Sequence, residues 1–338
     1  MSYYTETNPE QSRQIINTRQ LFETSISLKE KLFQYKGSMV WRKIRDNEYL
    51  YRLHDAAGNG KSIGRRTLEK ESIKNEFYSK KKELKGRKSA IDENLKRQAK
   101  YNKAAQINRV PLVAAAILKT LKKFQLNKRF CVVGTYALYA YEAMAGIQFM
   151  SDITATEDID LLWDGSKKIK LVTDLPVKSL IELLQKADKT FVKNKSYSAV
   201  NKDGFLVDII RAEPNSPWKK VDKTPFENNI DEIEPSVIAS LNGLNSSPKI
   251  MQCVIAQNGF PVMITVPDPR SFVIHKLWLS EEKNRIPEKR RRDRMQAIAT
   301  AEILKEFLPQ YRFTNKHLMM FPKKVFEEGI IKLQDVDV

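Results

Sequence analysis

Three short segments carry residues whose types and order could bind a phosphate group and a metal ion. In VVGTYAL, an apolar strand-like run ends at Gly134 and Thr135, where a helix-like pattern begins. In EDIDLL, a second strand-like run, Asp158 and Asp160 stand two residues apart. In LVDII, Asp208 lies alone inside a third apolar run. This order along the chain indicates phosphate binding followed by carboxylate–metal chemistry.

Each residue type suits its task. Glycine lets the backbone approach a ligand closely. The N–H groups at the start of a helix bind phosphate, and the Thr135 hydroxyl lies beside them. Side chains two apart on a strand point the same way, so Asp158 and Asp160 can share a metal ion. Burying Asp208 in an apolar strand costs free energy unless the carboxylate is paired or bound to a metal.

An acidic pair alone indicates little, because a chain with 41 acidic residues contains such pairs by chance. Other such pairs in this chain include Glu69 with Glu71, Glu232 with Glu234, and Asp335 with Asp337. None of these follows a strand–glycine–threonine–helix unit with a lone strand aspartate further on. The order of the three segments therefore indicates a site, and the alternative is that the three aspartates are only structural.

Hydrophobic periodicity indicates the elements that must position these residues. Strands are predicted at 130–135, 157–165, 190–199 and 205–213, with a hairpin of 250–257 and 260–266 over Asn258-Gly259. Helices are predicted at 110–124, 135–146, 179–187, in two long segments after residue 268, and near Thr314 and Lys323. This order is typical of an α/β (α+β) fold, with a mixed-sheet core followed by a C-terminal helical bundle.

The first 109 residues have a different pattern. A helix is predicted over 10–35, and a β-hairpin or small sheet over 38–64 around a glycine-rich turn. A long polar helix, or a pair of helices, is predicted over 66–105, and Gly86 is expected to break or bend it. We therefore predict three regions: an N-terminal region with a basic helical arm (1–109), the core (110–266) and the C-terminal helical region (267–338).

The charge balance favours polyanionic partners. The 338 residues include 59 Lys and Arg against 41 Asp and Glu, a net charge of +18. The segment 61–110 holds 16 basic and 6 acidic residues, a net +10, which makes it a candidate nucleic-acid-binding arm. The basic residues predicted to contact nucleic acid are Lys80, Lys81, Lys82, Arg87 and Lys88. The alternative is a solvated lysine-rich helix without a ligand.

Composition excludes several classes of protein. No run of about 18 apolar residues could cross a membrane, and the start of the chain, MSYYTETNPEQ, lacks the pattern of a secretory signal. Cys131 and Cys253, the two cysteines, lie in apolar strand-like runs, which excludes a disulfide scaffold. With three histidines, the chain has few of the side chains that usually bind zinc. The expected location is the cytoplasm.

The three segments together resemble the nucleotidyltransferase fold of the DNA polymerase beta superfamily. Over about 110–310 the chain is similar to stand-alone bacterial nucleotidyltransferase-like proteins, including AbiEii-type toxins of toxin–antitoxin pairs. In that family a Gly-Ser turn precedes the acidic pair, and Thr135 here retains the hydroxyl. A lysine-bearing helix and a basic–acidic helix follow the core, and the matching residues here are Lys276, Lys289 and Asp293.

The resemblance implies an enzyme that moves an NMP from an NTP to an acceptor hydroxyl. Asp158 and Asp160 would bind two Mg²⁺ ions, with Mn²⁺ as the alternative, and Asp208 would lie near the acceptor hydroxyl. The glycine–threonine turn would hold the phosphates, and Lys276 would offset charge on the leaving pyrophosphate. The alternative for Lys276 is a surface lysine, and for the 289–293 cluster a solvated helix start.

The favoured acceptor is RNA, with the 3′ end of tRNA as the example, because of the basic arm. A protein side chain or a small molecule such as an aminoglycoside is the alternative acceptor. A second class, a non-catalytic nucleic-acid-binding protein that keeps the fold, also stays open, although the three intact aspartates argue against it. A toxin or phage-defence role with an antitoxin partner follows from the resemblance alone.

Overall fold

The computed structural model describes residues 3–55, 57–165, 177–213, 224–226 and 232–313. The chain forms two compact units. The arm unit is Arg13–Ala105, and the core unit combines Met1–Ser12 with Gln106–Val338.

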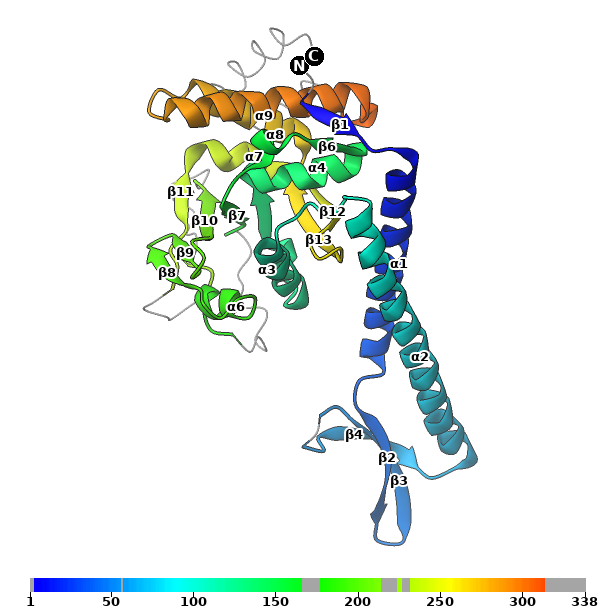
Figure 1. The fold of residues 1–338 in the computed structure, drawn as a ribbon. Coiled ribbons are helices and arrows are strands. Elements are labelled where there is room, and N and C mark those ends of the chain that lie inside the picture. The colour runs from blue at the N-terminus through cyan, green and yellow to red at the C-terminus, as the bar shows by residue number, and fades with distance from the viewer. Residues whose placement is uncertain (1–2, 56, 166–176, 214–223, 227–231, 314–338) are drawn as a thin grey trace. The chain divides into compact units, whose positions relative to one another are not determined.

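A mixed sheet forms the centre of the core unit (Figure 1). Its strands are β5 (Phe130–Val133), β7 (Asp158–Trp163), β8 (Val192–Lys195), β9 (Ser198–Val200), β10 (Leu206–Ala212) and β11 (Ser236–Ile238). Their order is β5-β7-β10-β9-β8, and β11 also pairs with β10. β7 and β11 run parallel to β10, whereas β5 is antiparallel to β7 and β9 to β10. The predicted mixed-sheet fold is therefore confirmed.

Two further strand pairs belong to the core unit: β12 (Lys249–Ile255) with β13 (Pro261–Pro267), and β1 (Tyr4–Glu6) with β6 (Ile147–Phe149). Its helices are α3 (Leu112–Lys123), α4 (Leu138–Ala145), α5 (Ser151–Thr154), α6 (Leu180–Gln185), α7 (Asn242–Ser246), α8 (Pro269–Glu281) and α9 (Pro287–Glu306). Short 3₁₀ turns lie at Leu126–Lys128, Gly134–Ala137, Ala239–Leu241 and Pro309–Tyr311. The helices predicted near Thr314 and Lys323 fall outside the described residues.

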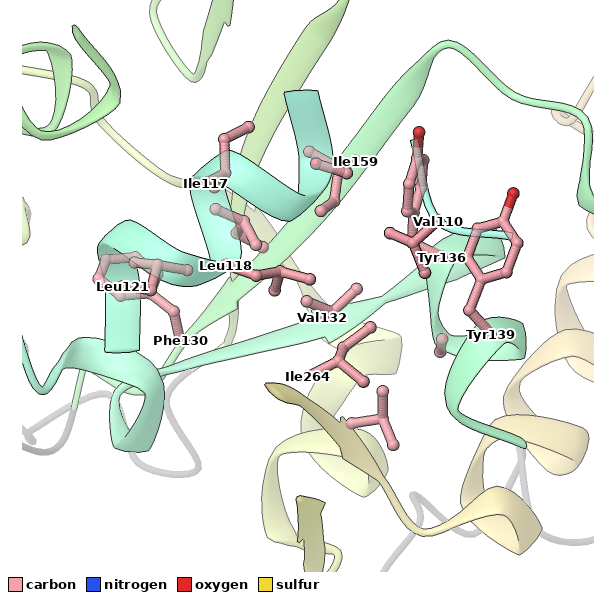
Figure 2. Packing of buried hydrophobic residues seen from close by; sticks show 14 of the residues in the cluster. Val110, Ile117, Leu118, Leu121, Phe130, Val132, Tyr136, Tyr139, Ile159 and Ile264 are labelled. Atoms are coloured by element: carbon pink, nitrogen blue, oxygen red, sulfur yellow. The ribbon is translucent and has the colours of Figure 1, made fainter. Parts of the chain in front are cut away.

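The main hydrophobic core lies between α3 and the sheet. One face of α3 is apolar at helical spacing, so burying that face removes it from water and fixes the helix on β5. Figure 2 shows the side chains that meet there: Ile117, Leu118, Leu121, Phe130, Val132 and Ile264. Among the described residues, Cys131 and Cys253 are buried thiols without a disulfide, and no helix has the length and apolar character needed to cross a membrane.

The arm unit is a helical hairpin with a small sheet at its turn (Figure 1). Its elements are α1 (Pro9–Gln34), β2 (Ser38–Ile44), β3 (Asn47–Leu53), β4 (Gly60–Arg65) and α2 (Leu68–Ala104). The Thr18 hydroxyl donates to Asn102 Oδ1 at 3.0 Å, which joins α1 to α2. Met39, Leu50 and Phe77 form the buried cluster under the sheet. This sheet confirms the predicted strands at 38–64.

The expected break at Gly86 is wrong, because α2 continues through it as one 37-residue helix. A glycine in an exposed helix interior costs about 1 kcal/mol. That cost is smaller than the gain from burying Phe77, Leu84 and Leu95 along the same helix. The Thr67 hydroxyl also caps the first turn by accepting a hydrogen bond from Lys70 N at 3.2 Å.

The small core of the arm unit makes its stability sensitive to one leucine. Leu50 is fully buried against Met39 and Phe77. Leu50→Ala should lower the unfolding free energy of the arm unit by about 2–5 kcal/mol through lost burial and a cavity. Ile44→Ala, in the same sheet but 46% exposed, should change it little. Denaturant titration with Trp41 fluorescence measures both, and equal effects would contradict this packing.

Candidate active site

Strand pairing brings the three predicted aspartates together at the starts of two neighbouring strands. β7 and β10 run parallel, and their register places Asp208 beside Asp160, with Asp158 two residues earlier in β7. β5 runs antiparallel to β7 with Val133 beside Asp160. The chain therefore leaves β5 at Gly134 next to the same carboxylate.

Alternation along the strands separates the carboxylates from the main core. Ile159 and Val207 point into that core and are fully buried. The aspartates lie on the other face and are half-buried. Further along that face, Leu162 and Ile210 pack in a second cluster. On this face, each strand begins with carboxylates and continues with apolar side chains. The packing of the apolar side chains fixes the strand backbone that carries the carboxylates.

Gly134 meets two requirements that other residues do not. Its φ of +64° lies in the left-handed region that favours glycine. A Cβ at this position would also overlap the Oδ2 atom of Asp160. The backbone at the turn is therefore packed directly against the carboxylate.

A buried glutamine from α9 supports the turn. The Thr135 hydroxyl accepts a hydrogen bond from Gln296 Nε2 at 3.1 Å, and the same nitrogen donates to the Ile153 carbonyl at 2.8 Å. Gln296 is fully buried and Thr135 is 7% exposed. Because the Thr135 oxygen accepts here, its own proton remains available for a further acceptor such as a phosphate oxygen.

Crowding shifts the acidity of the carboxyl groups. Burial, together with the neighbouring charge of Asp158, raises the pKa of Asp160 to about 7. Burial and Asp158 also raise the pKa of Asp208. Like charges in one partly dry site disfavour ionisation. The site therefore holds more negative charge than its surroundings neutralise, which is the condition that a bound cation relieves.

Two cations and an acid from α8, α9 and the segment between them lie near the aspartates. Lys276 Nζ on α8 is 2.7 Å from Asp293 Oδ1, and Arg285 Nε is 2.5 Å from Asp293 Oδ2. Lys276 and Asp293 are buried, so Lys276 is not a surface lysine. Burial lowers the pKa of Lys276. The charges of Lys276 and Arg285 both act on Asp160, lowering its pKa against the effect of burial.

Lys289 is exposed in the first turn of α9, and its charge lowers the pKa of Asp208 against the effect of burial. Lys195, at the end of β8, acts on Asp208 in the same direction. The structure thus gathers every predicted catalytic and nucleotide-site residue in the core unit: Gly134, Thr135, Asp158, Asp160, Asp208, Lys276, Lys289 and Asp293.

The donor set suits a magnesium ion. Carboxylate oxygens are the ligands that Mg²⁺ prefers, and the raised pKa values of Asp160 and Asp208 indicate uncompensated charge. Within the described part of the chain, no group of three or more His, Cys, Asp or Glu side chains is already arranged to hold a metal ion. The Thr156 hydroxyl donates a hydrogen bond to Asp158, so one oxygen of that carboxylate already has a partner.

The predicted nucleic-acid-binding residues lie on α2 of the arm unit, and most have interactions within it. Lys80 pairs with Glu83 at 2.8 Å. Lys81 donates to the Gly37 carbonyl at 2.5 Å. Two more ion pairs complete the set: Arg87 with Glu83, and Lys88 with Asp92. Lys82 is exposed on the same helix.

Sequence reasoning missed three residues of the site: Thr156, Arg285 and Gln296. Gln296 is three residues after Asp293 on one helix, so helical spacing could have placed it on the same face. Arg285 lies outside α9, just before it, and no spacing pattern marks it. Thr156 precedes β7 and is one of many threonines, so its contact with Asp158 depends on the fold alone.

Comparison with known proteins agrees with this geometry. A family model described as "Nucleotidyltransferase" matches residues 113–319, more than half of the chain. The chain therefore belongs to this nucleotidyltransferase family. Neither the curated proteins nor the solved structures give a match.

The raised pKa of Asp160 makes stability depend on pH. A carboxyl group with a higher pKa in the folded state binds its proton more tightly there, so stability falls as pH rises from 3.8 to about 7. Asp160→Asn should therefore raise the melting temperature by several degrees at pH 8 and hardly at pH 4. At pH 8, Mg²⁺ should raise the melting temperature of the wild type more than the melting temperature of the variant. A difference independent of pH would contradict the assigned crowding.

Gln296 is expected to act through Thr135. Gln296→Leu removes the donor to the Thr135 hydroxyl and should weaken NTP binding while lowering stability by about 1–3 kcal/mol. Thr300→Ala is the matched control, because it removes another buried hydrogen bond, to the Gln296 carbonyl, without touching Thr135. Calorimetric NTP titration together with melting curves checks this. Equal NTP affinity in both variants would show that Gln296 only stabilises the fold.

Proposed function

We propose that this protein is a metal-dependent nucleotidyltransferase that moves an NMP from an NTP to an acceptor hydroxyl. The observation that carries the proposal is the register of β7 and β10, which sets Asp208 beside Asp160 while Gly134 packs on the same carboxylate. Phosphate-binding backbone and metal-binding carboxylates then share one small site. The arrangement suits a reaction between a triphosphate and a hydroxyl.

Asp158 and Asp160 would hold the divalent cations, with Mg²⁺ as the favoured ion. When bound, the ions supply charge neutralisation for the triphosphate and a lower pKa for the attacking hydroxyl. The residues of the chain do the rest. Gly134 and Thr135 bind and orient the phosphates. The Thr135 hydroxyl oxygen accepts a hydrogen bond from Gln296, so the hydroxyl proton is available to donate to a phosphate oxygen.

In this proposal, Asp208 takes the proton of the acceptor hydroxyl. Its raised pKa makes it a better proton acceptor than an ordinary exposed aspartate. Lys276 lies close enough to influence Asp160 and can offset charge that develops on the leaving pyrophosphate. The ion pair with Asp293 fixes the position of the Lys276 ammonium group.

RNA is the acceptor that we favour, with the 3′ end of tRNA as the leading example. The net charge of +18 supports a polyanionic partner, and the basic arm on α2 would supply phosphate contacts. A toxin or phage-defence role, with an antitoxin as partner, is our extension of the family resemblance. Modification of a protein or a small molecule is the competing outcome of the test below.

The test is transfer of label from each α-³²P-labelled NTP to total RNA, to protein and to small molecules, with Mg²⁺ or Mn²⁺. Asp158→Asn and Asp160→Asn should each reduce transfer by about 10³-fold, since each removes a metal ligand. Asp208→Asn should reduce turnover while NTP affinity stays close to that of the wild type. Asp203→Asn, an exposed aspartate just before β10, is the matched control and should transfer normally. Full activity in both metal-ligand variants would refute the assignment.

A further inference from the structure

One face of the arm-unit sheet is open to solvent. Met39, Leu50 and Phe77 lie under the other face, which packs on α2. Because strand side chains alternate, the neighbouring positions form what we call the outer face. Its members are Val40, Arg42, Ile44, Tyr49, Tyr51 and Arg65. None of these six is fully buried, and the two arginines are exposed.

Arginine and tyrosine side chains form a row across this face. Antiparallel register places Arg42 of β2 directly opposite Tyr49 of β3, and Arg65 of β4 opposite Tyr49 on its other side. Adjacent strands are about 4.8 Å apart, so the three side chains are immediate neighbours. The Arg42 guanidinium also lies over one face of the Tyr51 ring, 4.9 Å from its centre, and one of its nitrogens donates to the Gly58 carbonyl at 2.9 Å, which fixes the charge in place. Two aromatic rings are thus flanked by two fixed positive charges.

The nearby carboxylates do not neutralise this row. Glu48 follows the alternation of the inner face and pairs with Arg66 at 2.5 Å. Asp55 accepts hydrogen bonds from Asn59 in the loop before β4. Within the described part of the sheet, the outer face therefore presents positive charge together with aromatic surface.

The lysine-rich helix carries one well-exposed ring, Tyr101, but most of its predicted contact residues already have partners. Lys80, Arg87 and Lys88 pair with acidic side chains on the same helix. The Tyr78 hydroxyl is held by the backbone of Met39, at 3.2 Å from its nitrogen and 3.1 Å from its oxygen. Charge on α2 can attract a polyanion, whereas the sheet places two rings directly beside two arginines.

We infer that the outer face binds single-stranded RNA, with bases stacked on Tyr49 and Tyr51 and phosphates bound by Arg42 and Arg65. Every base has a flat face that stacks on an aromatic ring, and arginine binds phosphate through two N–H groups. A duplex keeps its bases stacked on one another, so exposed rings select single strands. The inference rests on the proposed function in one respect, since this RNA would be the acceptor.

The experiment is fluorescence anisotropy of the full chain with a fluorescein-labelled oligouridine of about twelve nucleotides, without NTP. Tyr49→Ala and Tyr51→Ala should each raise the Kd by about tenfold. Tyr49→Phe and Tyr51→Phe should restore most of the binding, because the ring is kept. Arg42→Ala and Arg65→Ala should weaken binding and reduce the slope of log Kd against log salt by about one each.

Matched controls come from the same unit. Tyr101→Ala removes an exposed tyrosine, and Arg97→Ala an exposed arginine, both from α2. Neither should change the Kd appreciably. Melting curves should show that the outer-face variants remain folded, because their side chains are outside the buried cluster. Ultraviolet crosslinking of the oligouridine should label the peptide that contains Tyr49 and Tyr51.

Several outcomes would overturn the inference. These are unchanged binding in both folded tyrosine-to-alanine variants, absence of oligouridine binding by the wild type, or a preference for a duplex of the same length. Binding lost only when Lys80, Lys81 and Lys82 are reversed to Glu would place the RNA on α2 instead. If the wild type binds through the tyrosines but transfers no NMP, the proposed function fails and the RNA surface stands.

Discussion

Repulsion among three carboxylates is the constraint around which the core unit is arranged. Parallel pairing of β7 with β10 sets Asp208 beside Asp160, and Asp158 lies on the same face. Burial and mutual repulsion raise the pKa of Asp160 to about 7. A core without function would gain by replacing such a group with an apolar one. Keeping it is typical of a site whose negative charge serves a bound cation.

The other elements of the core unit act on this charge. Lys276 on α8 and Arg285 before α9 both share Asp293, so two cations are held near the carboxylates by one buried acid. Asp293 thereby fixes the positions of both cations and neutralises part of their positive charge. Gln296, further along α9, holds the Thr135 turn. The C-terminal helices therefore complete the site as well as the hydrophobic core.

The arm unit exposes charge and aromatic surface on one face of its sheet, while the other face keeps the unit folded. Its helices are joined by buried polar contacts such as Thr18 with Asn102. Arg52 ties the sheet to the end of α1 by donating to the Gln34 carbonyl at 2.7 Å, and it stacks on Phe77. With the inner face occupied in this way, the outer face of the sheet is left for a ligand. The charge count directed attention to α2, but a count does not show which charges are already paired.

The sequence by itself determined the principal elements of the core, because apolar periodicity and the conformational freedom of Gly134 are local properties. It did not indicate the short elements β1, β6, α5, α7 and β11. It identified the three aspartates, the turn and the mixed sheet before any contact was known. Tertiary structure alone decided which strands pair, that α2 continues through Gly86, and that Gln296 reaches Thr135 across 161 residues of chain. Packing energy is gained between segments distant in sequence, and it exceeds local preferences of about 1 kcal/mol. The burial of Lys276 against Asp293 has the same cause, because only the packing of α8 on α9 removes both charges from water.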